Sequence, residues 1–293
     1  MKHFKRVIAL LLVLLMTLTL APAFETEAAG AKVTTDKYII YKEAGIYPAA
    51  FKLKIKAKKG YNVYYTTNDK ATTKNVIKSG KSKSILIEKF TNVKVYAVKK
   101  SKKMTNAKLK KYLKKGKFES YSYSISDFPA FSDAFTDIKK VTIDAVVKNR
   151  LEYMGEGVRI LIAVPVFSKQ YAHTDGSIDY FARYEMYGLA IEKGRYIVKN
   201  GGTELVKMEL SKSDNEYKVD SIRFNIDGEK SEEDLKDMCK EYKNLASEMI
   251  KSASNEYANL KAVIEGLKTY NKKNQITDIT AIKFTDGLTV CIE

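Results

Sequence analysis

The most regular pattern in the chain is an alternation of apolar residues and lysines close to its N-terminal end. Residues 51–59 read Phe-Lys-Leu-Lys-Ile-Lys-Ala-Lys-Lys. Successive side chains of a β-strand point to opposite faces, so one face of this segment is apolar and the other carries Lys52, Lys54, Lys56 and Lys58. The pattern predicts a strand with one buried face and one hydrated face.

Shorter runs of the same kind recur on both sides of this strand. We expect strands over residues 38–41, 62–66, 84–87, 93–98 and 121–125, with turns at Gly60, Asn68-Asp69 and Ser79-Gly80. Six or seven short strands within about 95 residues are typical of a β-sandwich. The first half of the chain is therefore predicted to be all-β.

The pattern changes to helical spacing at Ser132. Apolar residues at 135, 138, 141, 145 and 146 predict an amphipathic helix of about 15 residues. Strand-like runs follow, with turns between them at Asp175-Gly176, Lys193-Gly194, Gly201-Gly202 and Ser213-Asp214-Asn215; the runs cover 158–167, 180–191, 203–210 and 217–224. One helix on a four-stranded antiparallel sheet predicts a cystatin-like α+β domain.

Residues 231–271 contain no proline, and their apolar residues recur at steps of three and four. Ser231 and the three acidic residues after it are typical of a helix start. A single helix over this segment would reach about 60 Å and project towards a partner. We favour two helices divided near residues 252–255, with Ser254 or Asn255 as the second cap. Strands at 279–284 and 288–292 would then form a closing hairpin around Asp286-Gly287.

Charge is distributed unequally between the two halves. Residues 31–126 contain 25 lysines, no arginine and five acidic residues, a formal charge of +20, whereas residues 127–293 have a formal charge of −4. A mature chain of about 270 residues is long enough for two cores. We predict a lysine-rich β-sandwich over 31–126 and an α+β domain over 132–293, joined where Asp127-Phe128-Pro129 interrupts the strand pattern.

The densest charge lies between the last two predicted strands of the sandwich, in residues 99–117. A polycationic module attracts polyanions, and lysine acts as a hydrated point charge where arginine would grip a phosphate through two bonds. We expect a short helix at 107–113 and diffuse, salt-sensitive binding of an anionic polymer or membrane surface; the alternative is a flexible exposed loop. The candidate residues are Lys99, Lys100, Lys102, Lys103, Lys108, Lys110, Lys111, Lys114, Lys115 and Lys117.

The first 23 residues have the three parts of a secretory signal peptide. Lys2, Lys5 and Arg6 precede an apolar run over 7–20, and Ala21-Pro22-Ala23 supplies a cleavage site. The run is too short for a membrane anchor. We expect a secreted protein, extracellular or associated with the cell wall, and export argues against nucleic acid as a partner. The sequence shows no lipobox cysteine, sortase motif or second membrane segment, so its retention would be non-covalent.

Four segments of the first half carry a resemblance to a known family. They read Gly-Ile-Tyr at 45–47, Val-Tyr-Tyr-Thr-Thr-Asn-Asp at 63–69 with Thr72 behind it, Val-Lys-Val-Tyr-Ala-Val at 93–98 and Tyr-Ser-Tyr-Ser-Ile at 121–125. Residues 36–126 resemble a chitobiase/beta-hexosaminidase C-terminal-type domain, although Asn-Asp-Lys-Ala at 68–71 replaces the usual Asp-Gly-Ser and Pro of its central turn. The resemblance implies an immunoglobulin-like sandwich with an accessory role and no catalytic residues.

A second resemblance covers residues 132–293. Tyr-Glu-Met-Tyr-Gly at 184–188, Gly-Gly-Thr at 201–203 and Glu-Tyr-Lys-Val-Asp at 216–220 resemble segments of an uncharacterised extracytoplasmic domain of Gram-positive bacteria. This resemblance implies a fold and a location outside the membrane, and it adds no function.

Candidate catalytic and metal-binding residues are few. His173 is the one histidine beyond the predicted signal peptide, and its turn-rich surroundings indicate a surface position. Zinc needs three or four ligands in close order, which one histidine and two distant cysteines do not supply. We expect Cys239 and Cys291 to be buried free thiols, with a disulfide as the alternative. Asn225, Asp227 and Gly228 lack the other positions of a calcium loop and predict a turn before a helix, so no metal or cofactor is expected.

Two further groups of side chains suggest carbohydrate chemistry. Glycoside hydrolysis requires two facing carboxylates, and Glu185 and Asp220 form the best pair, although ordinary outward-facing charges are the simpler interpretation. Tyr64 and Tyr65 are candidates for stacking on a sugar, with one of the two expected in the core because they face opposite sides of their strand.

Together these observations predict a secreted, non-enzymatic cell-surface binding protein. The cationic sandwich would attach to anionic envelope polymers, and the α+β domain would contact a protein or ligand, with residues 231–271 as the candidate protein-binding segment. The alternative is a glycan-active enzyme or an accessory module of a carbohydrate-processing system, which a facing carboxylate pair in a deep cleft would favour.

Overall fold

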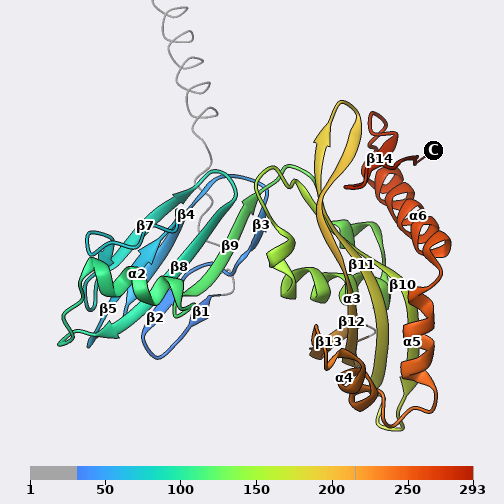
Figure 1. Cartoon of the computed structure of the whole chain (residues 1–293), viewed down its shortest axis with the longest axis horizontal. Helices are drawn as coiled ribbons and strands as arrows, with labels where there is room; N and C mark the ends of the chain where they lie inside the picture. The colour runs from blue at the N-terminus through green and yellow to red at the C-terminus, as the bar shows by residue number, and fades with distance from the viewer. Residues whose placement is uncertain (1–31, 215, 293) are drawn as a thin grey trace, which may run out of the picture.

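The computed structural model describes residues 32–214 and 216–292, and the predicted signal peptide lies outside these residues. Within them the chain forms three β-sheets and five α-helices, a β-rich fold of more than one domain (Figure 1). No helix of the described residues combines the length and the apolar character needed to cross a lipid bilayer.

Two sheets make up residues 33–125. The six strands expected from the sequence are present, together with three strands of two or three residues that are too short for an alternation to be recognised. The four-stranded sheet has the order β1 (Val33–Thr34), β2 (Tyr38–Ile40), β4 (Phe51–Ala57), β7 (Ser82–Ile87). The five-stranded sheet has the order β3 (Gly45–Tyr47), β9 (Glu119–Ile125), β8 (Thr91–Lys99), β5 (Tyr61–Thr66), β6 (Val76–Ile77).

The two sheets face each other across one hydrophobic core. Strand β4 contributes Leu53 and Ile55, and β5 and β8 contribute Val63 and Val95, all of them fully buried or nearly so. Burying an aliphatic side chain of this size contributes about 1.5–3 kcal/mol. On β4 the buried positions alternate with lysines on the outer face, which confirms the predicted pattern.

The second half is built on a long antiparallel meander. The helix begins after Thr136, later than the expected Ser132, because residues 131–134 form a separate 3-10 turn. Helix α3 (Asp137–Asn149) packs Ile143 and Val146 against the sheet, whose strands are β10 (Ile160–Ala172), β11 (Ile178–Glu192), β12 (Arg195–Ser213) and β13 (Glu216–Phe224). The 3-10 turn before α3 is η1 (Phe131–Ala134), and a second 3-10 turn, η2 (Leu151–Tyr153), follows α3.

The turn predicted at Gly201-Gly202 is wrong, because β12 runs through both glycines as one strand of 19 residues. A Cβ atom on Gly201 would overlap the ring of Tyr187, its partner on β11, and a Cβ on Gly202 would overlap the hydroxyl of Tyr153. The two glycines therefore make room for aromatic side chains. The length of β12 lets it pair with β11, with β13 and, in parallel, with β14 (Ala281–Lys283).

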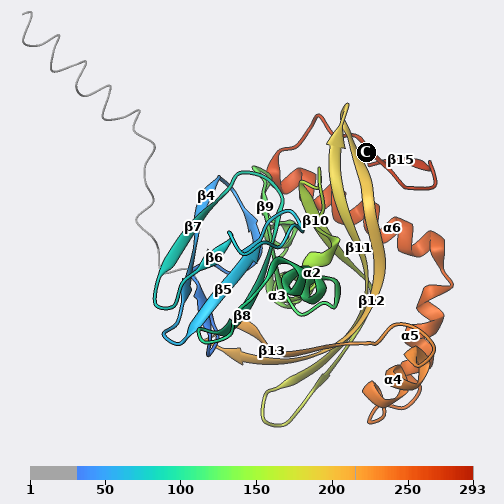
Figure 2. The same ribbon diagram turned by 60° about the vertical axis from the view of Figure 1, so that its left-hand side comes forward.

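Helices α4 (Ser231–Met238) and α5 (Leu245–Ala253) pack on Phe181 of β11 in a hydrophobic cluster separate from that of α3, whereas α6 (Glu256–Asn274) shares the main core cluster with α3 (Figure 2). The division predicted at 252–255 is confirmed, because the Asn255 side chain accepts a hydrogen bond from the Ala258 N–H at 3.0 Å and caps the last helix. A further division at Asn244, whose φ is 65°, was not predicted.

A short hairpin follows the helices, as predicted. Strand β14 pairs with β15 (Thr289–Cys291) and joins the meander through β12. Both cysteines are free. Cys239 is buried between α4 and α5, and burial raises the pKa of its thiol to about 11. The expectation of a second buried thiol is wrong, because Cys291 lies on an edge strand and is exposed.

The two halves meet around residues 127–131. Arg159 forms an ion pair with Asp127 and lies over the ring of Phe128 at 5.3 Å, and the Tyr270 hydroxyl donates a hydrogen bond to the Pro129 carbonyl at 2.8 Å. A pocket of about 200 Å³, lined mainly by apolar side chains of both halves, lies beside this connection. The connection is therefore packed and hydrogen-bonded.

Replacing Gly188 by alanine tests the close packing of the meander. The new Cβ would overlap both the Asn200 side chain and the Tyr153 carbonyl, so we expect Gly188→Ala to lower the free energy of unfolding by about 1–3 kcal/mol. Gly155→Ala is the matched control, because its Cβ would meet the same Asn200 side chain at 3.7 Å. Urea unfolding curves measure both, and equal midpoints would show that the packing is looser than described.

Candidate anion-binding surface

The ten lysines predicted to bind anions lie on the end of β8, the following turn, helix α2 (Asn106–Lys114) and the turn before β9 (Figure 1). All ten are exposed. Thr105 caps the helix by accepting a hydrogen bond from the Lys108 N–H, and Lys111 and Lys114 occupy its last turn, where the helix dipole favours cations. The helix predicted at 107–113 is therefore confirmed.

Helix α2 is held on the outer face of the five-stranded sheet by its apolar side. Leu109 is fully buried and packs with Tyr64 of β5 and Val98 of β8. The Tyr96 ring lies 5.2 Å from the ring of Tyr112, which extends the contact along the helix. With Leu109 on the sheet, the lysines of α2 are exposed to solvent on a helix, and the lysines of residues 100–103 and 115–117 lie in exposed turns.

The charges of this surface are not neutralised by acidic neighbours. None of the ten lysines forms an ion pair with another described residue. The one ion pair that involves a lysine of residues 32–126 joins Lys94 to Asp69 at 2.7 Å, and within the described chain no acidic group of the second half pairs with a sandwich lysine. Uncompensated charge of one sign produces a field that attracts polyanions.

A shallow hollow at one end of this surface brings a few of these groups together. It is lined by Gly60, Tyr61, Lys99, Lys100 and Ser101. The Lys100 N–H donates a hydrogen bond to the Gly60 carbonyl at 2.7 Å, which ties the start of the lysine-rich segment to the strand beside it. The hollow offers two ammonium groups and a hydroxyl to a single anionic group.

The predicted sugar-stacking residues are not available on this surface. Tyr64 lies under α2 and is 7% exposed, and burial raises the pKa of its hydroxyl. Tyr65 points to the other side of β5 and packs against the core between the two sheets. One of the two was expected in the core; Tyr65 packs there, and α2 covers Tyr64 on the outer face.

No known family model, curated protein or solved structure matches the chain. The function of the lysine surface must therefore be argued from its geometry alone.

The predicted carboxylate pair is not brought together. Glu185 lies opposite Thr203, whereas Asp220 lies on β13 beside Ser221, which is paired with Glu209 six residues further along β12. Six residues of a strand span about 20 Å. Glycosidase carboxylates lie about 10 Å apart at most, so this pair cannot act on one glycosidic bond.

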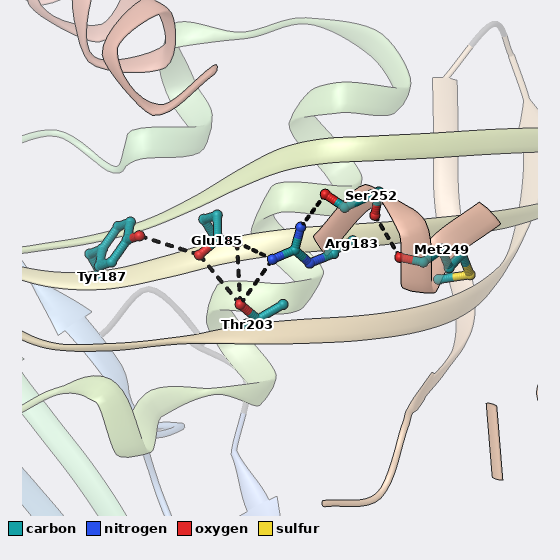
Figure 3. Close-up of polar contacts among 6 residues, drawn as sticks. All are labelled: Arg183, Glu185, Tyr187, Thr203, Met249 and Ser252. Atoms are coloured by element: carbon teal, nitrogen blue, oxygen red, sulfur yellow. Dashed lines mark hydrogen bonds and ion pairs between the residues drawn. The ribbon is translucent and has the colours of Figure 1, made fainter. Parts of the chain in front are cut away.

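Glu185 instead belongs to a buried ion pair (Figure 3). Its Oε1 accepts a hydrogen bond from Arg183 Nη2 at 2.7 Å, and the hydroxyls of Thr203 and Tyr187 also donate to this carboxylate, each at 3.2 Å. Arg183 Nη1 donates to the Ser252 carbonyl at the end of α5. Asp220 faces solvent, where hydrogen bonds from Ser211 and Lys218 lower its pKa. Both carboxylates therefore have structural partners.

The remaining candidates also have ordinary structural positions. His173 is exposed in the turn between β10 and β11, as predicted, with its Nε2 3.7 Å from Asp179. The Asn225 amide donates to the Ser231 hydroxyl, and Asp234 accepts the Ile226 N–H, so this segment is the predicted turn before α4. The described residues contain no group of three or more histidine, cysteine or acidic side chains that could hold a metal ion.

Two other carboxylates of the second half are buried, although the sequence pattern did not predict it. Asp179 pairs with Lys207 at 2.9 Å and accepts a hydrogen bond from Tyr242, and Glu204 pairs with Arg150 at 2.8 Å. The alternation of residues along β11 could have indicated that Asp179, Arg183 and Glu185 share one face of the strand. Their burial depends on helices that follow much later in the chain.

We expect Glu185→Gln to destabilise the fold by about 3–5 kcal/mol, because it leaves the Arg183 guanidinium buried without its counter-charge. The double variant Arg183→Met/Glu185→Leu removes both charges and should be more stable than Glu185→Gln. Asp220→Asn is the control and should leave the unfolding midpoint unchanged. Thermal unfolding measures all three; a Glu185→Gln variant as stable as the parent would rule out this structural role.

Proposed function

We propose that this chain is a secreted, non-enzymatic cell-surface binding protein whose lysine-rich sandwich attaches to anionic polymers of the cell envelope. The observation that carries the proposal is the set of ten exposed lysines in residues 99–117, held on a folded scaffold and unpaired within the described residues. Lysine ammonium groups bind phosphate-rich polymers as hydrated point charges, so the binding is diffuse and depends on salt.

We propose further that the first half forms an immunoglobulin-like sandwich, in which residues 36–126 are related to the chitobiase/beta-hexosaminidase C-terminal-type domain. The face-to-face arrangement of the four-stranded and five-stranded sheets supports this assignment. In the second half, packing of α3 against the antiparallel strands β10 to β13 supports a cystatin-like fold, and we propose that residues 132–293 are related to an uncharacterised extracytoplasmic domain of Gram-positive bacteria.

The second domain is proposed to contact a protein through the helices that follow the meander. Ile250 on α5 and Tyr257 on α6 are large apolar side chains that remain exposed, Tyr257 to 78%. They lie on either side of the division at Ser254-Asn255. In this arrangement the sandwich supplies attachment and the helices of the second domain supply the protein contact.

Export follows from the signal peptide proposed for residues 1–23 and provides the compartment in which such polymers occur. The non-enzymatic character rests on the positions of the candidate acids, because Glu185 is neutralised by Arg183 and lies far from Asp220. This pair was the best candidate for the glycan-active enzyme, and an accessory module of a carbohydrate-processing system stays the alternative.

The proposal is tested by replacing three lysines on the exposed side of α2. We expect Lys110→Gln/Lys111→Gln/Lys114→Gln to weaken binding to a synthetic poly(glycerol phosphate) about tenfold, because three ammonium groups no longer contact phosphates. Each lost contact should also reduce the slope of the logarithm of the dissociation constant against the logarithm of the salt concentration by about one. Fluorescence anisotropy at several salt concentrations measures both quantities.

The matched control removes the same charge from the second domain. Lys230, Lys243 and Lys273 are exposed and form no ion pair with the described residues. Their replacement by glutamine should leave the affinity nearly unchanged. Equal weakening by both triple variants would mean that only net charge matters, and binding that is insensitive to salt would contradict the proposal.

A further inference from the structure

A second cationic surface lies on β4, outside the lysine-rich segment. Lys52, Lys54 and Lys56 share the outer face of the four-stranded sheet, while Leu53 and Ile55 point into the core. Residues two apart on a strand are about 7 Å apart, so the three side chains form a straight row with this spacing. We call these three residues the β4 row.

The surroundings of the β4 row leave its charge available. The residues directly opposite on β7 are the uncharged Leu86, Ser84 and Ser82. The Lys54 ammonium lies 4.9 Å from the centre of the Tyr41 ring, and no lysine of the row forms an ion pair with another described residue. Three like charges in a row without counter-charges produce a strip of positive potential that attracts an anionic chain.

The β4 row and helix α2 lie on opposite sides of the sandwich. Tyr96 and Val98 of β8 point outward under α2, whereas Val93 and Val95 point inward to the core shared with β4. Two packed sheets are separated by about 10 Å and a helix lies about another 10 Å beyond its sheet, so α2 and β4 are about 20 Å apart. This distance exceeds the Debye length of about 8 Å at physiological salt, and the two surfaces bind independently.

We infer that the sandwich is a bivalent polyanion cross-linker, which holds one polymer segment on α2 and a second on the β4 row. The inference rests on the proposed function and names its ligand as a linear polyol phosphodiester. A 1,3-linked poly(glycerol phosphate) carries one negative charge per repeat of six backbone bonds, and six bonds of an extended chain span about 7 Å, as two residues of an extended polypeptide do. This repeat matches the spacing of the β4 row.

Two observations favour a polymer over a membrane surface. The apolar side of α2 is occupied by its contact with the sheet, with Leu109 fully buried, so it is not free to insert between lipids. The two cationic surfaces also face away from each other, and a flat membrane can meet only one of them. A network of polymer strands meets both.

Aggregation of beads coated with poly(glycerol phosphate) tests the inference. The full-length mature protein should aggregate the beads, with a maximum at intermediate protein concentration, because excess protein saturates every bead and removes the bridges. Lys52→Gln/Lys54→Gln/Lys56→Gln and Lys110→Gln/Lys111→Gln/Lys114→Gln should each still bind the beads while at least tenfold more protein is needed for aggregation. Circular dichroism and thermal unfolding show that each variant is folded.

The Lys230→Gln/Lys243→Gln/Lys273→Gln control should aggregate beads as the parent does. Binding without aggregation by the parent, or undiminished aggregation by the β4 variant, would overturn the cross-linking inference and leave the proposed function standing. Absence of binding by the parent would overturn both. Aggregation of vesicles containing anionic lipid, without aggregation of the polymer beads, would assign the two surfaces to membranes instead.

Discussion

The arrangement of the sandwich depends on one constraint: a lysine ammonium group cannot be buried without a partner, and this part of the chain has few acidic partners to offer. Each strand must therefore bury its apolar face and leave its lysines in water. The same constraint acts on α2, whose Leu109 is buried while its lysines point outward. Folding the sandwich thus concentrates positive charge on its two outer surfaces without any dedicated binding pocket.

The second half differs in that it buries some of its charged side chains. Three of its acidic side chains are buried in ion pairs, Glu185 with Arg183, Asp179 with Lys207 and Glu204 with Arg150. The first two of these pairs connect the meander to the C-terminal helices, because Arg183 also bonds to the end of α5 and Asp179 to Tyr242. The first half therefore carries its charge on the surface, whereas the second half also places charged pairs in its interior.

The sequence predicted the features that depend on neighbouring residues. The alternation on β4, the Asn255 cap and the closing hairpin are all local patterns, and the structure confirms them. The predicted turn at Gly201-Gly202 was wrong, because the two glycines make room for the side chains of Tyr187 and Tyr153, which are distant in sequence.

The candidate site shows the same limit. The ten lysines and their short helix could be found from composition and periodicity, whereas the packing of Leu109 on Tyr64 and Val98 could not. The exposed row on β4 was visible as an alternation, but its position opposite α2 depends on how two sheets pack together. The partners of Glu185 likewise come from β12 and α5.

The most direct measurement of the central claim is the acetylation rate of each lysine, followed by mass spectrometry with and without poly(glycerol phosphate). The account predicts that the polymer slows acetylation at residues 99–117 and at Lys52, Lys54 and Lys56, and leaves lysines of the second domain unchanged. Uniform protection of all lysines, or protection confined to the second domain, would contradict it.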